Sequence, residues 1–121
     1  MAGGNNGQGS KWIRKDKRLA IYIRDGFACA YCGTNLRQAD PRRVTLDHLT
    51  PRHHGGGNEA TNLVTACVSC NSSRGDRALE LFAPGGALER IAVLRVAPLN
   101  MPLARALIAG TAGDADVEAA R

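Results

Sequence analysis

The pattern of apolar and polar positions predicts an amphipathic helix near the start of the chain, in the segment KWIRKDKRLAIYIRDG, residues 11–26. Apolar residues recur there at the spacing of one helical stripe. This stripe consists of Trp12, Leu19 and Ile23, with Ile13 and Ala20 beside it. Ser10 is placed to cap the start of the helix, and Gly26 is placed to end it. The other face is basic and carries Lys11, Arg14, Lys15, Lys17, Arg18 and Arg24, with Asp16 among them.

The middle of the chain predicts short strands joined by loops. FACAYCG, residues 27–33, predicts a turn that presents two thiols. The β-branched segment RRVTLDH, residues 42–48, predicts a strand, and the glycines at 55, 56 and 57 require a loop after it. NLVTA, residues 62–66, predicts a second strand, followed by a helix from about residue 68 to residue 74 or 75. The expected local order is strand, loop, strand, helix.

Three later segments, residues 77–83, 86–95 and 100–110, show apolar spacing of i, i+3 or i+4 and predict packing helices. Asn100 is a candidate N-cap of the last one, and Gly110 a candidate stop. Residues 1–10 and 111–121 offer little to bury and are expected to be disordered tails. The sequence therefore predicts a single domain over residues 11–110.

Composition indicates that this domain needs a cross-link. A chain of 121 residues with two Phe, two Tyr and one Trp must build a small core, mainly from Leu, Ile, Val and Ala. The opening MAGGNNGQGS has no apolar leader segment, and no stretch approaches the roughly 20 apolar residues of a membrane span. We expect no membrane contact and a cytoplasmic location, where reducing conditions make disulfides less favoured than metal binding.

Four cysteines supply the candidate cross-link. Cys29 and Cys32 form one Cys-x-x-Cys pair, and Cys67 and Cys70 form another after 34 intervening residues. Two such pairs provide the four thiolates of a closed tetrahedral zinc site, so we expect structural zinc. A redox pair or an iron–sulfur cluster is the alternative. A closed site has no open coordination position, so any catalysis must lie elsewhere in the chain.

The charge of the chain favours a polyanionic partner. Sixteen Lys and Arg oppose eleven Asp and Glu, for a formal net charge of +5. The basic face of the first helix favours phosphate contact, whereas an ordinary solvated surface is the alternative. The candidate nucleic-acid contacts are Lys11, Arg14, Arg18 and Arg52.

Asp47 and His48 are a carboxylate and an imidazole at the end of a predicted strand. Neighbouring residues of a strand point to opposite sides, so the two cannot chelate one ion together. They suit a division of labour across a phosphodiester, in which a metal acts on one side and a base activates water on the other. The alternative is an Asp that caps a turn next to a surface His.

The segment DHLTPRHHGGGNEATNLVTACVSCNSSRGD resembles the HNH endonuclease family, in the form that carries two Cys-x-x-Cys knuckles. The elements that carry the resemblance are FACAYCG, then LDH followed by P and GG, then NL, then CVSCNSSRGD. They occur in this order over roughly residues 19–82. The resemblance implies an α+β fold, with a ββα-metal (His-Me finger) core stapled by zinc, an N-terminal helix and C-terminal helices.

The resemblance also implies roles for individual residues. His48 matches the general base, Asp47 a ligand of the catalytic divalent cation, and Asn62 the residue that braces the loop behind the histidine. Asn71 stands where the family name has a His and would be the second metal ligand. Such an oxygen-rich pair fits magnesium or manganese and leaves other divalent transition metals open. Arg74 would contact phosphate, and a surface pair with Asp76 is the alternative.

From this resemblance we expect a metal-dependent DNA endonuclease that releases a 5′-phosphate and a 3′-hydroxyl and nicks one strand per subunit. Its partner would be DNA, and the chain would act as a monomer, a weak homodimer or a member of a larger phage or restriction complex. A non-catalytic zinc-stabilised nucleic-acid-binding module is the alternative, although such a module has no need of Asp47, His48 and Asn71 together. An RNA nuclease is a further alternative, because a backbone-reading core says little about the bases.

Overall fold

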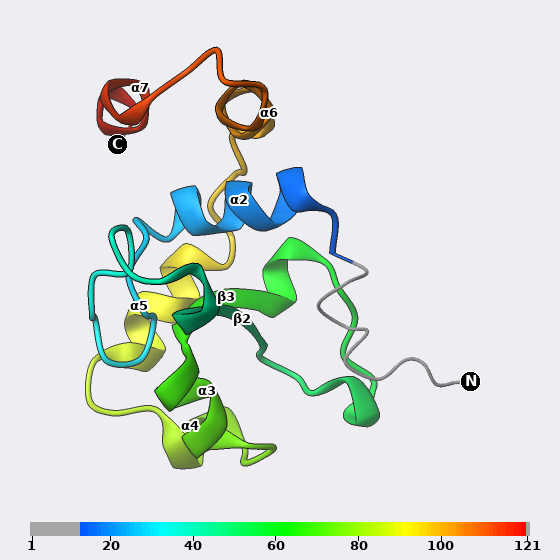
Figure 1. The fold of residues 1–121 in the computed structure, drawn as a ribbon. Coiled ribbons are helices and arrows are strands. Elements are labelled where there is room, and N and C mark those ends of the chain that lie inside the picture. The colour runs from blue at the N-terminus through cyan, green and yellow to red at the C-terminus, as the bar shows by residue number, and fades with distance from the viewer. Residues whose placement is uncertain (1–12, 121) are drawn as a thin grey trace.

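Two short antiparallel strands lie at the centre of the structure, a computed structural model that describes residues 13–120 (Figure 1). Strand β2 spans Val44–His48 and strand β3 spans Leu63–Cys67. Their register pairs Val44 with Cys67 and His48 with Leu63. Helix α3, Val68–Arg74, begins directly after β3 and packs against both strands. The predicted order of strand, loop, strand and helix is therefore confirmed, and the fold is the expected α+β fold.

Helix α2, Lys15–Arg24, is the predicted N-terminal helix, but it begins at Lys15 with Arg14 at its N-cap. Ser10, Lys11 and Trp12 lie outside the described residues. The helix is buried on two sides, because it lies between the sheet and helix α6, Met101–Ala109 (Figure 1). Its residue Ile21 packs in a cluster with Leu63, and its other buried residues pack in a cluster with Ala104 of α6. The sequence predicted a single apolar stripe on this helix. Ile21 lies outside that stripe, so its burial was not predicted.

The C-terminal helices agree with the sequence pattern. They are α4, Leu79–Phe82, and α5, Ala87–Leu94, followed by α6. The side chain of Asn100 accepts a hydrogen bond from the Leu103 N–H at 3.1 Å, and Gly110 ends α6 in a left-handed conformation with φ of 81°. Both predicted helix boundaries are confirmed. Among the described residues, no helix has the length and apolar character needed to cross a bilayer.

The end of the chain differs from the expected disordered tail over 111–121. Helix α7, Asp114–Ala119, forms there and buries Val117. Arg37, in the loop that follows the first cysteine pair, forms ion pairs with Asp114 at 3.0 Å and with Glu118. These contacts join segments about 80 positions apart, so local composition gave no sign of them.

Candidate functional site

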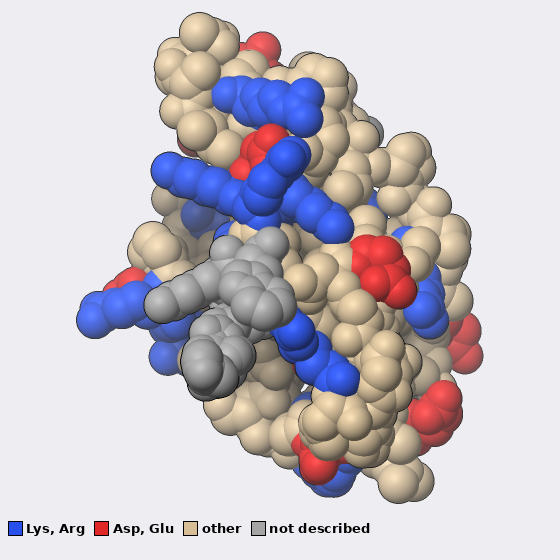
Figure 2. Space-filling model, turned by 90° about the vertical axis from the view of Figure 1, so that its right-hand side faces the viewer, with Lys and Arg blue, Asp and Glu red and all other residues tan. Residues whose placement is uncertain are grey.

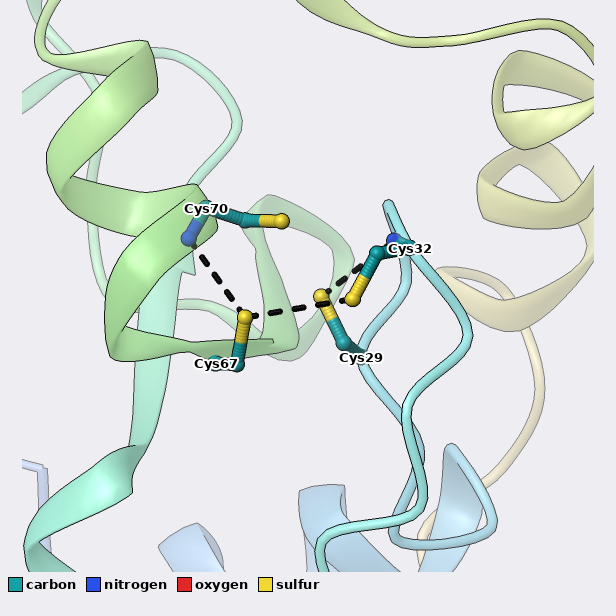
Figure 3. A group of neighbouring side chains, drawn as sticks. All are labelled: Cys29, Cys32, Cys67 and Cys70. Atoms are coloured by element: carbon teal, nitrogen blue, oxygen red, sulfur yellow. Dashed lines mark hydrogen bonds between the residues drawn. The ribbon is translucent and has the colours of Figure 1, made fainter.

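The four cysteines lie together between two turns of the chain (Figure 3). All four Sγ atoms lie within 4.8 Å of one another, and Cys32 Sγ lies 3.9 Å from Cys67 Sγ. A zinc ion with Zn–S bonds of about 2.3 Å requires sulfurs about 3.8 Å apart. The Cys32 N–H points at Cys29 Sγ at 3.5 Å, and the Cys70 N–H points at Cys67 Sγ at 3.4 Å. The cluster therefore fits a structural zinc ion.

The electrostatics of the cluster also favour a cation. Burial raises the pKa of Cys29, and burial together with the neighbouring thiols raises the pKa of Cys70. Burial acts in the same direction at Cys32, but hydrogen bonds from Thr34 outweigh it and lower the pKa of Cys32 to about 6. Four thiolates in this volume repel one another, and a divalent cation among them would remove that cost.

Asp47 lies near the end of β2 with its side chain turned toward α3. It is 6% exposed, and its Oδ2 accepts one hydrogen bond from the Tyr31 hydroxyl and another from Arg74 at 2.7 Å. Burial, together with the charge of Asp47, raises the pKa of Tyr31, so this hydroxyl stays protonated and donates. Tyr31 was not predicted as a site residue. The only indication in the sequence was that an aromatic residue lies between two candidate metal ligands, Cys29 and Cys32.

Arg74 is a buried structural residue in this fold, whereas the sequence predicted that it contacts phosphate. It is 1% exposed, and besides Asp47 it donates to the carbonyl oxygens of His48 at 3.0 Å, Leu49 at 2.7 Å and Arg77 at 2.9 Å. Burial acts to lower the pKa of Arg74, but the bond to Asp47 and its charge raise it. The guanidinium is therefore charged. The alternative of a surface pair with Asp76 is also wrong, because the side chain turns into the protein.

Asn71 lies beside β2 on the same side as Asp47. Its Nδ2 donates to Thr45 Oγ1 at 2.9 Å and to the Leu46 carbonyl at 3.4 Å, so the amide group is held next to the strand. Within the part of the chain that the structure describes, neither Asn71 Oδ1 nor Asp47 Oδ1 takes a hydrogen bond. One carboxylate oxygen and one amide oxygen are ligands that magnesium and manganese accept. This donor set fits the divalent cation that the resemblance implies.

His48 has a different set of neighbours. Its Nε2 lies 2.8 Å from Oδ1 of Asn58, in the loop between the strands. An amide oxygen only accepts, so the proton of this bond lies on Nε2 and the lone pair of a neutral ring lies on Nδ1. The backbone oxygen of Asn58 accepts a bond of 2.6 Å from Lys17 Nζ of α2. Asn58 was missed in the sequence, where a polar residue after three glycines was the only signal.

Asn62 holds the loop that follows His48. It is 4% exposed, its Oδ1 accepts from the Thr50 N–H at 2.8 Å, and its Nδ2 donates to the carbonyl oxygens of Thr50 at 3.1 Å and Gly57 at 2.9 Å. A Cβ at Gly56 would lie 1.8 Å from the Thr50 oxygen and 2.8 Å from Asn62 Nδ2. Glycine at this position therefore permits the close approach of the two sides of the loop.

Lys and Arg side chains gather on the face shown in Figure 2, at the level of α2 and α6. Arg14 is exposed and shares Asp16 with Arg105, at 3.3 Å and 3.2 Å. Lys15 is exposed, Arg18 is half-buried, and Arg52 is exposed in the loop after β2. Lys11 lies outside the described residues.

Arg24 does not belong to the exposed basic side of α2, although the sequence placed it there. Its side chain is 1% exposed and pairs with Asp25 at 2.7 Å. It also donates to the carbonyl oxygens of Ala60 at 2.9 Å and Leu63 at 2.6 Å. Arg24 ties α2 to the start of β3 and is unavailable to a partner.

Comparison with known proteins agrees with the resemblance found in the sequence motifs. Residues 29–77 match the model of the HNH endonuclease family. A "CRISPR-associated endonuclease Cas9" of Corynebacterium diphtheriae is 32% identical over 71 residues, which are 58% of this chain and 6% of that protein. A protein of the same name from Actinomyces naeslundii is 34% identical over 67 residues, 54% of this chain and 6% of that protein. The chain thus spans about 6% of the length of these relatives, and no solved structure matches it.

Proposed function

We propose, from the match of residues 29–77 to the model of the HNH endonuclease family, that this chain is a divalent-metal-dependent endonuclease that hydrolyses DNA phosphodiester bonds. The observation that carries the proposal is the arrangement of two adjacent residues at the end of β2. Asp47 is turned toward Arg74 of α3, whereas the ring of His48 is held by Asn58 of the loop. This arrangement separates a metal-binding oxygen from a base by one position of a strand.

His48 would act as the general base. With its Nε2 proton directed to Asn58, the lone pair on Nδ1 takes a proton from the attacking water. The hydrogen bonds of Asn62 would keep the loop, and with it Asn58, at a fixed distance from the strand. The ring is therefore oriented before substrate binds, which lowers the cost of reaching the transition state.

Asp47 and Asn71 would hold the catalytic cation through their Oδ1 atoms, which accept no hydrogen bond from the described residues. Such a cation, when bound, stabilises negative charge on the reacting phosphate and on the leaving oxygen. Both ligands are oxygens, so we propose magnesium or manganese as the catalytic ion and zinc as the structural ion of the cysteine cluster.

The products would be a 5′-phosphate and a 3′-hydroxyl. Water oxygen bonds to phosphorus, the bond between phosphorus and O3′ breaks, and O3′ gains a proton. One site per chain cuts one strand, so a monomer nicks and a double-strand break needs a dimer or two encounters. We propose that the exposed residues Arg14 and Arg52 and the half-buried Arg18 contact the DNA backbone, since backbone contacts position a protein without reading sequence.

The test is a nicking assay on supercoiled plasmid. Zinc-loaded protein is freed of other metals and incubated without added metal, then with magnesium, manganese, nickel or extra zinc. We expect open-circle product only where a divalent ion is restored, and a count of one zinc per chain throughout. Binding of DNA without nicking under every metal would support a non-catalytic module instead. A matched reaction on single-stranded RNA distinguishes a DNA nuclease from an RNA nuclease.

A further inference from the structure

A buried network joins the first cysteine turn to the candidate catalytic centre. Tyr31 lies between Cys29 and Cys32, and it is 2% exposed. Its ring stands edge-on to Phe82, with 5.1 Å between the ring centroids. Its hydroxyl donates to Asp47 Oδ2. The ring is therefore held by the cysteine turn and by α4, and it aims one hydrogen bond at a carboxylate 16 positions away.

The second cysteine turn reaches the same carboxylate from the other direction. Cys67 caps the start of α3, and Arg74 at the end of that helix donates to the same Oδ2 of Asp47. Each half of the four-cysteine cluster thus supplies one donor to Asp47. Two donors on Oδ2 restrain the rotation of the carboxylate, and no hydrogen bond from the described residues engages Oδ1.

We propose that Tyr31 is a positioning residue for Asp47, through which the zinc site sets the affinity of the catalytic cation. This inference rests on the proposed function, in which Asp47 is a ligand of that cation. A metal ligand depends on the hydrogen bonds that orient it, and loss of one such bond typically costs about 10- to 100-fold in metal affinity or activity. The four cysteines therefore do more than hold the fold together.

The direct test compares Tyr31→Phe with Tyr22→Phe. Both remove one hydroxyl, but Tyr22 lies on α2, where its ring contacts Phe27. Manganese binding to zinc-loaded protein is measured by electron paramagnetic resonance of the free ion, together with zinc content and circular dichroism. For Tyr31→Phe we expect about 10- to 100-fold weaker manganese binding, unchanged zinc content, and nicking that recovers at saturating manganese. Tyr22→Phe should match the wild type.

A second measurement leaves Tyr31 in place and so does not depend on the folding of a Tyr31 variant. In the Tyr22→Phe background Tyr31 is the only tyrosine, because the chain has two, so biosynthetic 3-fluorotyrosine labels it alone. Stoichiometric manganese should broaden its ¹⁹F resonance, and Asp47→Asn should abolish that broadening.

The outcomes separate the two claims. Wild-type manganese affinity in folded Tyr31→Phe, or a ¹⁹F resonance that stays sharp while manganese binds through Asp47, overturns the positioning role and leaves the proposed function standing. If Asp47→Asn binds manganese as tightly as the wild-type protein does, both claims are overturned.

Discussion

His48 and Asp47 are neighbours in the chain but differ in every side-chain contact. The imidazole bonds with a loop amide, and the carboxylate with a phenol and a guanidinium. If one acts on water and the other on a cation, the two should respond differently to substitution. Single substitutions of these two residues should therefore distinguish the general base from the metal ligand.

His48→Ala should lower the nicking rate by about 10²- to 10⁴-fold, because it removes proton abstraction from water. Asp47→Ala should also lower the rate, but high manganese should restore part of it, because the defect is in cation affinity. The measurement is a nicking assay across a manganese titration, with DNA binding measured for each variant. Wild-type nicking by His48→Ala, or its recovery with manganese, would remove His48 from the role of base.

Asn58→Ala should lower the nicking rate by about tenfold, less than loss of the base itself. Without the amide oxygen, Nε2 loses its acceptor and the ring populates the tautomer that protonates Nδ1. The ¹⁵N chemical shifts of the His48 ring report the tautomer directly. Asn58→Asp keeps an acceptor oxygen and serves as the control. A variant with unaltered ¹⁵N shifts would show that Asn58 does not set the tautomer.

At the scale of elements, α2 is buried on two sides, and tertiary contacts divide its charged side chains into two groups. Arg24 donates to the Leu63 backbone oxygen of the sheet, and Lys17 donates to the Asn58 backbone oxygen of the loop. Arg14 and Lys15 are exposed, and Arg18 is half-buried. Of the second group, Arg14 and Arg18 are the residues proposed above to contact DNA, so they are the ones to test.

Replacement of Arg14 and Arg18 by Ala should weaken DNA binding and lower its salt slope by at most about two. Folding should persist, because the buried residues of α2 are untouched. The control is the double change of Arg42 and Arg43 to Ala. These two exposed residues precede β2, at the opposite end of that strand from His48. An equal effect of both pairs on the salt slope would show that only net charge matters.

At the scale of the whole molecule, the four-cysteine cluster joins segments that are far apart in the chain. Cys29 and Cys67 are themselves members of the largest buried cluster, with Leu36, Val64 and Ile91. Tyr31 is the one aromatic residue among the buried apolar side chains of the described chain. A core this poor in large side chains gains little from packing alone, so zinc binding should dominate stability.

Cys67→Ser should unfold or aggregate the chain. Apparent binding free energies of structural zinc are on the order of 10 to 16 kcal/mol in small zinc peptides, and serine does not replace a thiolate. Circular dichroism melting and zinc content provide the measurement. Ser69→Ala, in the same turn but not a ligand, should melt like the wild type. Near-native circular dichroism of Cys67→Ser with one zinc per chain would contradict a structural zinc site.

The sequence by itself determined most of the elements, although not α7, and the metal-ligand spacing of the cysteines. The apolar spacing of α2, the strands on either side of the glycine loop, and the cap at Asn100 are local features. They depend on residues a few positions apart, which is the range over which periodicity and capping act. The spacing of the cysteine pairs likewise restricts the ligand geometry before any folding is considered.

Tertiary structure alone decided how the charged and polar side chains are used. The sequence predicted that Arg74 contacts phosphate. In the structure Arg74 instead donates hydrogen bonds to the carbonyl oxygens of His48 and Leu49, because buried backbone oxygens need donors. Arg24 is buried for the same reason at Ala60 and Leu63. Tyr31 and Asn58 enter the site through contacts across 16 and 10 positions. Such partners follow from the three-dimensional arrangement of backbone groups, which no local pattern of residues encodes.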